Sequence, residues 1–164
     1  MRAREPPLPG RITGGPIPGP VRNPATVDIL DGLLGRERSA LATYALVVRA
    51  LAEEHLQDLE DNRGSHARRV ALLVGRILDL GGVPVTAGPP WRACVRALRS
   101  AAAMTGPAVV LRALAAGEYG DLGAYIRMHA TIDPVSTVLL RDVLLPEQVR
   151  SHARVAHIAG GPPG

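Results

Sequence analysis

The sequence has few of the large aromatic side chains that β-sheet proteins use in their cores. It contains no phenylalanine, one tryptophan and three tyrosines, so aromatic residues make up 2% of the chain. Sandwiches and barrels are normally rich in aromatic and β-branched residues. The apolar residues here are mostly leucine, valine and alanine, and leucine and alanine favour helices. The composition therefore predicts an all-α protein.

Several other features that would indicate a function class are also missing. Lysine is absent, and Cys94 is the only cysteine, so no disulfide can form within the chain. No apolar stretch reaches the ~18 residues needed to span a membrane, and no signal peptide is recognisable at the N-terminus. We therefore expect a cytoplasmic protein without a membrane partner.

The net charge of +4 does not indicate a nucleic-acid-binding surface. Residues 1–24 carry four arginines and one glutamate, so they account for +3 of this charge. A protein that binds nucleic acid usually shows a basic face within its folded part. Neither a run of basic residues nor a set of stacking aromatics is present, and we expect no nucleic-acid partner.

Proline and glycine divide the chain into a tail, one domain and a short end. Residues 1–24 hold seven prolines and four glycines, a composition typical of a disordered or polyproline-like tail. Residues 25–159 form one domain, and residues 160–164 form a flexible C-terminal end. The sequence leaves open whether the tail docks a protein partner and whether the chain forms a homodimer.

Apolar residues in the domain recur at steps of three and four, which predicts helices. Four long ones are expected, at about residues 25–55, 59–80, 107–131 and 135–159, with a shorter crossover helix from Trp91 to Met104. Pro146 predicts a kink, or a helix start preceded by a short helix. In the last helix Leu145, Val149, His152, Val155 and Ala159 are expected to face inward. The resulting fold class is a four-helix bundle of two αα-hairpins.

The two halves of this domain repeat one pattern. Glu37 and Tyr44 stand seven residues apart on one helix, and Glu118 and Tyr125 repeat that spacing on another. Each pair is followed by a helix with the same four letters, Ser65-His66-Ala67-Arg68 and Ser151-His152-Ala153-Arg154. An interior carboxylate needs a partner or a metal to offset its burial. The repeat therefore predicts a shared polar centre, in which each tyrosine hydroxyl bonds to the carboxylate of the opposite half.

This order of motifs resembles the ferritin-like superfamily, the relatives of bacterioferritin and rubrerythrin. Over about residues 27–159 the chain is most similar to small bacterial four-helix-bundle proteins of unknown function. The resemblance implies a metal centre made from Glu37, His66, Glu118 and His152. Metal-binding members also carry a Glu three residues before each His. Arg63 and Val149 occupy those two positions here, so a site for two metal ions is not expected.

Two alternatives remain for the centre. In one, Glu37, His66, Glu118 and His152 hold a single divalent ion (Fe, Mn or Zn), with solvent completing its coordination. In the other no metal binds, and each glutamate pairs with a histidine or with Arg63. The residues expected around the centre in either case are Tyr44, Asn62, Arg63, Tyr125 and Gln148.

The incomplete ligand set argues against oxygen-dependent catalysis. We expect a bundle with a degenerate Glu/His centre that is non-catalytic, or that binds at most one metal ion. Two further functions stay open. One is a metal-binding protein in iron or manganese handling or in protection against oxidative stress. The other is a structural or partner-binding bundle that uses its Pro-rich tail.

Overall fold

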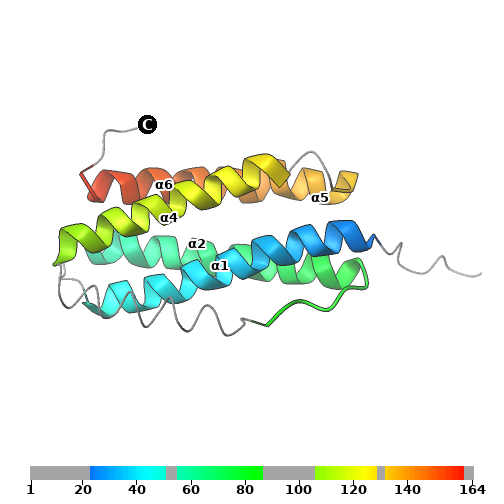
Figure 1. The fold of residues 1–164 in the computed structure, drawn as a ribbon, viewed down its shortest axis with the longest axis horizontal. Helices are drawn as coiled ribbons and strands as arrows, with labels where there is room; N and C mark the ends of the chain where they lie inside the picture. The colour runs from blue at the N-terminus through cyan, green and yellow to red at the C-terminus, as the bar shows by residue number, and fades with distance from the viewer. Residues whose placement is uncertain (1–22, 51–54, 87–105, 129–131, 161–164) are drawn as a thin grey trace, which may run out of the picture.

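The computed structural model describes residues 23–50, 55–86, 106–128 and 132–160 of the chain. Within these ranges the protein is helical and has no strand (Figure 1), which confirms the all-α prediction. None of the described helices is long and apolar enough to cross a membrane. Most of the predicted tail, the predicted crossover helix from Trp91 to Met104 and residues 161–164 lie outside the described residues.

The first helix, α1 (Pro24–Ala50), begins one residue before the predicted start. The Asn23 side chain accepts a hydrogen bond from the backbone N–H of Thr26 at 3.2 Å, which satisfies one of the free N–H groups of the first turn. Pro24 has no N–H and fits the first helical position. The helix thus starts inside the range that was predicted to be tail.

The second helix, α2 (Leu56–Asp79), starts three residues earlier than predicted and ends in a tight turn. Gly81 adopts a positive φ of 71°, a conformation that glycine adopts readily. At Gly82, close packing rather than backbone conformation requires a glycine. A Cβ there would lie 2.8 Å from Val27 Cγ1 and 2.9 Å from Ile77 Cγ2. His55, predicted as the end of the first helix, lies directly before α2.

The third and fourth long helical segments are α4 (Pro107–Met128) and a composite of α5, η2 and α6. Asp133 caps α5 (Pro134–Leu139) by accepting from the backbone N–H groups of Val135 and Ser136. A π-helical turn, η2 (Leu140–Leu144), then leads directly into α6 (Leu145–Ile158). Pro146 cannot donate a backbone hydrogen bond and its ring crowds the carbonyl four residues earlier. The wider π turn therefore stands where the sequence predicts a kink.

The helices pack in two pairs that lie against each other. α1 packs along α2 and α4 packs along α6, while contacts of α2 with α6 and of α1 with α4 join the pairs. The apolar core has two separate clusters. One contains Leu33, Leu73, Tyr125 and Leu140, and the other contains Tyr44, Leu59, Leu111, Leu114 and Val155. Along each long helical segment, buried polar side chains lie between residues of these two clusters.

Candidate functional site

The buried polar residues between the two apolar clusters form the candidate site. Every long helical segment contributes at least one of them at the same level of the bundle. They are Glu37 from α1, Asn62, Ser65, His66 and Arg69 from α2, Glu118 from α4, and Gln148 and Ser151 from α6, and none is more than 5% exposed. Such groups are normally satisfied by hydrogen bonds or paired charges.

His66 bridges the two buried carboxylates. Its Nδ1 lies 2.7 Å from Glu37 Oε2 and its Nε2 lies 2.8 Å from Glu118 Oε1. Both contacts are hydrogen bonds only if both ring nitrogens carry a proton. Burial lowers the pKa of His66, but the hydrogen bonds and charges of Glu118 and Glu37 outweigh it and raise this pKa above 6.5. The geometry therefore favours an imidazolium ion.

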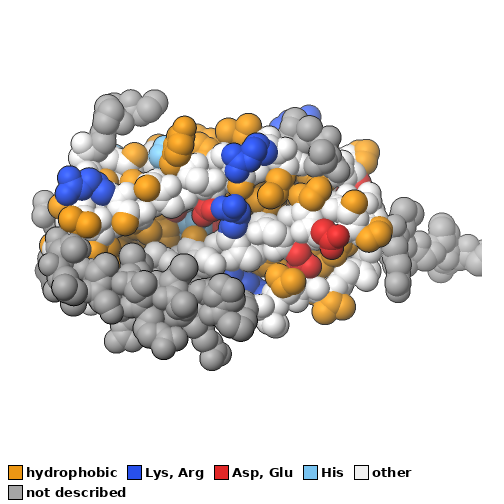
Figure 2. Space-filling model, in the orientation of Figure 1, with side chains coloured by type: hydrophobic (Ala, Val, Ile, Leu, Met, Phe, Trp, Pro, Cys, Tyr) orange, Lys and Arg blue, Asp and Glu red, His pale blue; other side chains and the backbone are white. Residues whose placement is uncertain are grey.

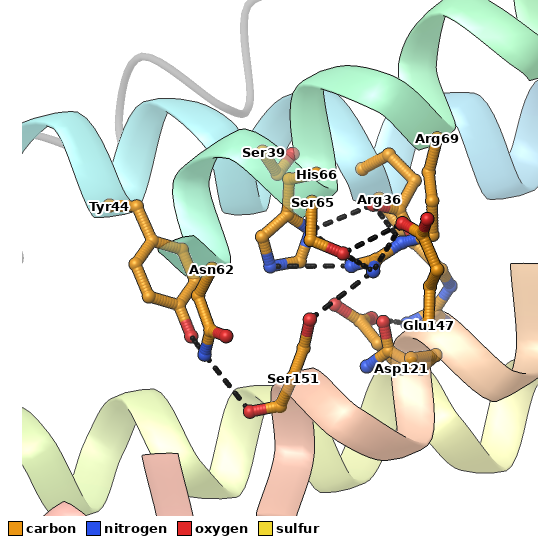
Figure 3. Close-up of polar contacts among 12 residues, drawn as sticks. Arg36, Ser39, Tyr44, Asn62, Ser65, His66, Arg69, Asp121, Glu147 and Ser151 are labelled. Carbon is orange, nitrogen blue, oxygen red and sulfur yellow. Dashed lines mark hydrogen bonds and ion pairs between the residues drawn. The ribbon is translucent and has the colours of Figure 1, made fainter. Parts of the chain in front are cut away.

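Arg69 places a second cation beside the first. Its side chain is fully buried and its Nε lies 2.9 Å from Glu37 Oε2. Nη1 donates to the hydroxyls of Ser65 at 2.8 Å and Ser151 at 3.2 Å, and Figure 3 shows these hydroxyls beside the guanidinium group. The Arg69 Nε is not aligned for a hydrogen bond, so its contact with Glu37 is an ion pair.

The guanidinium group also lies against the imidazole ring. Arg69 Nη2 is 2.7 Å from His66 Nδ1 and 3.5 Å from Nε2. A donor lying in the ring plane beyond Nδ1 would be much farther from Nε2. The two distances therefore place Nη2 over the ring face, in direct contact with the imidazole.

Two tyrosines complete the carboxylate contacts, each reaching across to the opposite half of the chain. Tyr44 donates to Glu118 Oε1 at 2.7 Å, and Tyr125 donates to Glu37 Oε1 at 2.6 Å. The sequence predicts these crossed bonds, and the structure confirms them. Burial, reinforced by the adjacent carboxylates, raises the pKa of both phenols, so they remain neutral donors.

Two carboxamides support these groups from α2 and α6. Asn62 Nδ2 donates to the Tyr44 hydroxyl and to the backbone oxygen of Ser151, both at 2.9 Å, as Figure 3 shows. Gln148 Nε2 donates to Glu118 Oε2 at 2.7 Å. Burial alone would raise the pKa of Glu118, but the hydrogen bond and charge of His66, the Tyr44 hydroxyl and the charge of Arg69 together outweigh it, and this pKa is lowered.

The centre is therefore close to electrically neutral. Glu37 and Glu118 contribute two negative charges, and Arg69 and protonated His66 contribute two positive charges. Glu147 stands at the edge, where it accepts from Ser65 at 2.8 Å and lies 4.0 Å from Arg69. Buried charges are tolerated when they are paired and hydrogen-bonded in this way.

The structure brings together three of the four predicted metal ligands. Glu37, His66 and Glu118 converge, but His152 does not join them. The His152 ring lies 5.8 Å from that of Tyr119, a largely exposed residue, and its Nδ1 is buried without a hydrogen-bond partner. The prediction that His152 faces the shared centre is therefore wrong. Gln148 and Ser151 occupy the inward face of α6 instead.

Arg63 is a second correction. It pairs with Glu60 at 2.9 Å, and its side chain is 43% exposed, so it does not reach Glu37 or Glu118. The arginine at the centre is Arg69, which sequence reasoning missed. The spacing could have indicated it, because Arg69 follows His66 by three residues and residues three positions apart lie on the same helix face. Tyr44, Asn62, Tyr125 and Gln148 lie around the centre, where they were expected.

The donor geometry does not suit a metal ion in this charge state. The His66 ring stands between the two carboxylates and directs one nitrogen at each, so the three residues do not share a common point. In the described part of the chain, no group of three or more His, Cys, Asp or Glu is arranged to hold a metal. A metal ion would have to displace the proton of His66 and the adjacent Arg69 cation.

A search with models of known protein families and a search of curated proteins found no match to this chain.

Proposed function

We propose that this chain is a ferritin-like bundle in which an internal ion-pair network replaces the metal ions, and that it works without catalysis. The proposal rests on one observation, the fully buried guanidinium group of Arg69 against Glu37 and His66. In metal-binding bundles of this type, cations between inward carboxylates offset the negative charge. Here Arg69 and protonated His66 supply that charge.

The burial of the centre supports a non-enzymatic role. Glu37, His66 and Arg69 are at most 1% exposed, so a substrate has no contact with them. A general acid or base must come within hydrogen-bond reach of the proton it transfers. We therefore assign the network a structural role, in which it joins all four long helical segments of a structural or binding protein.

A metal-binding function is the second candidate, and one specific observation favours it. Two carboxylates and an imidazole converge within hydrogen-bond distance, and these donors suit Fe, Mn or Zn. Binding one ion would require deprotonation of His66 and movement of Arg69. A role of the Pro-rich tail in partner binding remains a further proposal, which concerns residues outside those described.

Metal content distinguishes the two candidates. The full-length protein, purified without an affinity tag, is incubated at neutral pH with Fe²⁺, Mn²⁺ or Zn²⁺, dialysed and analysed for bound metal. We expect far less than one ion per chain. The control variant Glu37→Gln should give the same background. About one ion per chain in the wild type, lost in Glu37→Gln, would overturn the ion-pair proposal and support the metal site.

A further inference from the structure

A groove of about 940 Å³ runs between α1 and α4. Its walls extend along α1 from Gly32 to Val47 and along α4 from Val110 to Asp121, a length of about 20 Å at the usual helical rise. The volume is in the range of small-molecule sites. The surface between α4 and α1 in Figure 2 is mostly hydrophobic or uncharged, with few charged groups.

Glycines keep this groove open. A Cβ added at any of four groove glycines would meet no atom of the described residues within 4 Å, and none of them has a positive φ; they are Gly32, Gly35, Gly117 and Gly120. Glycine inside a helix is less stable than alanine. Neither backbone conformation nor close packing among the described residues explains this choice. Their common effect is the space that they leave between the described parts of α1 and α4.

The two ends of the groove differ in polarity. α1 and α4 run antiparallel (Figure 1), and Arg36 pairs with Asp121 at 3.0 Å at one end. Val47, Val110 and Leu114 form the other end. The hydroxyls of Ser39 and Thr43, which lie between the ends, donate to backbone oxygens of their own helix. The groove therefore offers charge at one end and an apolar wall along the rest.

Within the described part of the chain, the lining of the groove indicates the charge of its occupant. Tyr44 and Glu118 line its floor, although they are 0% and 3% exposed. Arg36 is 45% exposed and uses one N–H group on Asp121. Its other N–H groups can receive a carboxylate in the bidentate geometry that arginine favours.

We propose that this groove binds a linear amphiphile with a carboxylate head, such as a long-chain carboxylate. The head lies at Arg36, and the chain runs past Gly35 and Gly117 towards Val47 and Val110. The groove shares Tyr44 and Glu118 with the centre, but its glycines and Arg36 take no part in the ion-pair network. The metal measurement above and the binding measurement below can therefore fail separately.

Calorimetric titration of the full-length protein with dodecanoate, below its micelle concentration, tests the site. Gly35→Leu and Gly117→Leu fill the groove and should weaken binding at least about tenfold. Leucine is a better helix former than glycine, so both variants should fold, which circular dichroism checks. The control is Gly75→Leu on α2, outside the groove, where a Cβ also meets nothing; it should bind like the wild type.

Two changes of charge, one in the protein and one in the probe, test where the head group binds. Arg36→Gln should weaken dodecanoate binding about tenfold, and dodecyltrimethylammonium should bind far less tightly than dodecanoate. Absence of dodecanoate binding by the wild type, equal binding by the groove-filling variants, or equal binding of the cationic probe would each overturn the proposal. So would sedimentation equilibrium showing a wild-type dimer that Gly117→Leu converts to a monomer, because a second copy would then occupy the groove.

Discussion

Arg69 and His66 stabilise the fold only together with the carboxylates that they face. Each carboxylate, if left without its partner, would be a buried unpaired charge, and removal of one member of a buried pair costs ~3–5 kcal/mol. The network is therefore a set of mutually dependent groups, and its stability cannot be divided among single contacts.

Arg69→Met tests this dependence. The methionine keeps much of the side-chain volume but leaves Glu37 without its cation, so the free energy of unfolding should fall by ~3 kcal/mol. Arg63→Met is the matched control, because Arg63 makes an exposed pair with Glu60 and should cost less than ~1 kcal/mol. Urea denaturation measures both. Equal losses in the two variants would contradict the central role of Arg69.

The charge of His66 makes stability depend on pH. Its pKa is raised above 6.5 in the folded protein, so its contribution is fully present below pH 6.5 and is lost as the pH rises through the folded pKa. The pKa of Glu118 is lowered from 4.5, so its contribution is present above pH 4.5 and is lost as the pH falls further.

Urea denaturation across this range, with wild type and His66→Gln compared at each pH, measures the effect. We expect the difference in the free energy of unfolding between them to be largest at mildly acidic pH and to shrink above pH 6.5, because glutamine does not titrate. A difference that instead grows as the pH rises through 6.5 would show that His66 is neutral in the fold.

At the scale of the helical element, apolar periodicity predicts most of the fold but not the inward face of α6. The pattern selected Val149 and His152, yet Val149 is 47% exposed and the buried positions are Gln148, Ser151 and Val155. Periodicity identifies a buried face by its apolar side chains. At the polar centre, the buried face of α6 carries the amide of Gln148 and the hydroxyl of Ser151. The apolar pattern therefore selected the adjacent positions, Val149 and His152.

Two glycines on and after α2 give a prediction for this helix. Gly82→Ala would bring a Cβ within 3 Å of Val27 and Ile77, and such overpacking costs ~1–3 kcal/mol. Gly75→Ala, at an open and exposed position on the same helix, should instead stabilise the protein by ~0.5–1 kcal/mol. Thermal unfolding should show shifts of opposite sign. Equal shifts would mean that the end of α2 is not packed against Val27.

At the scale of the whole molecule, the sequence repeat predicts part of the site and misses its asymmetry. The Glu–Tyr pairs occupy equivalent places and bond across the two halves. The histidines do not, because His66 is fully buried and His152 is partly exposed. Only one imidazole can stand between Glu37 and Glu118. Arg69 then takes the remaining space at the centre, whereas Val155, its counterpart in the repeat, joins an apolar cluster.

This arrangement makes His66 the link between the two halves, so the crossed tyrosine bonds should be energetically coupled. Tyr44→Phe and Tyr125→Phe each remove one donor to a buried carboxylate, which should cost ~1.5–3 kcal/mol. Because both carboxylates share His66, the losses in the double variant should depart from additivity by ~0.5–1 kcal/mol. Urea denaturation of the wild type, the two single variants and the double variant gives this coupling.

Tyr119→Phe provides the control for the same cycle, because its ring is 69% exposed and lies on the outer side of α4. Combined with Tyr44→Phe, it should add within ~0.5 kcal/mol, as independent sites do. Additivity in both cycles would mean that the carboxylates respond separately and that His66 does not connect them. Coupling confined to the Tyr44–Tyr125 pair would show that one ion-pair network holds the two halves of the bundle together.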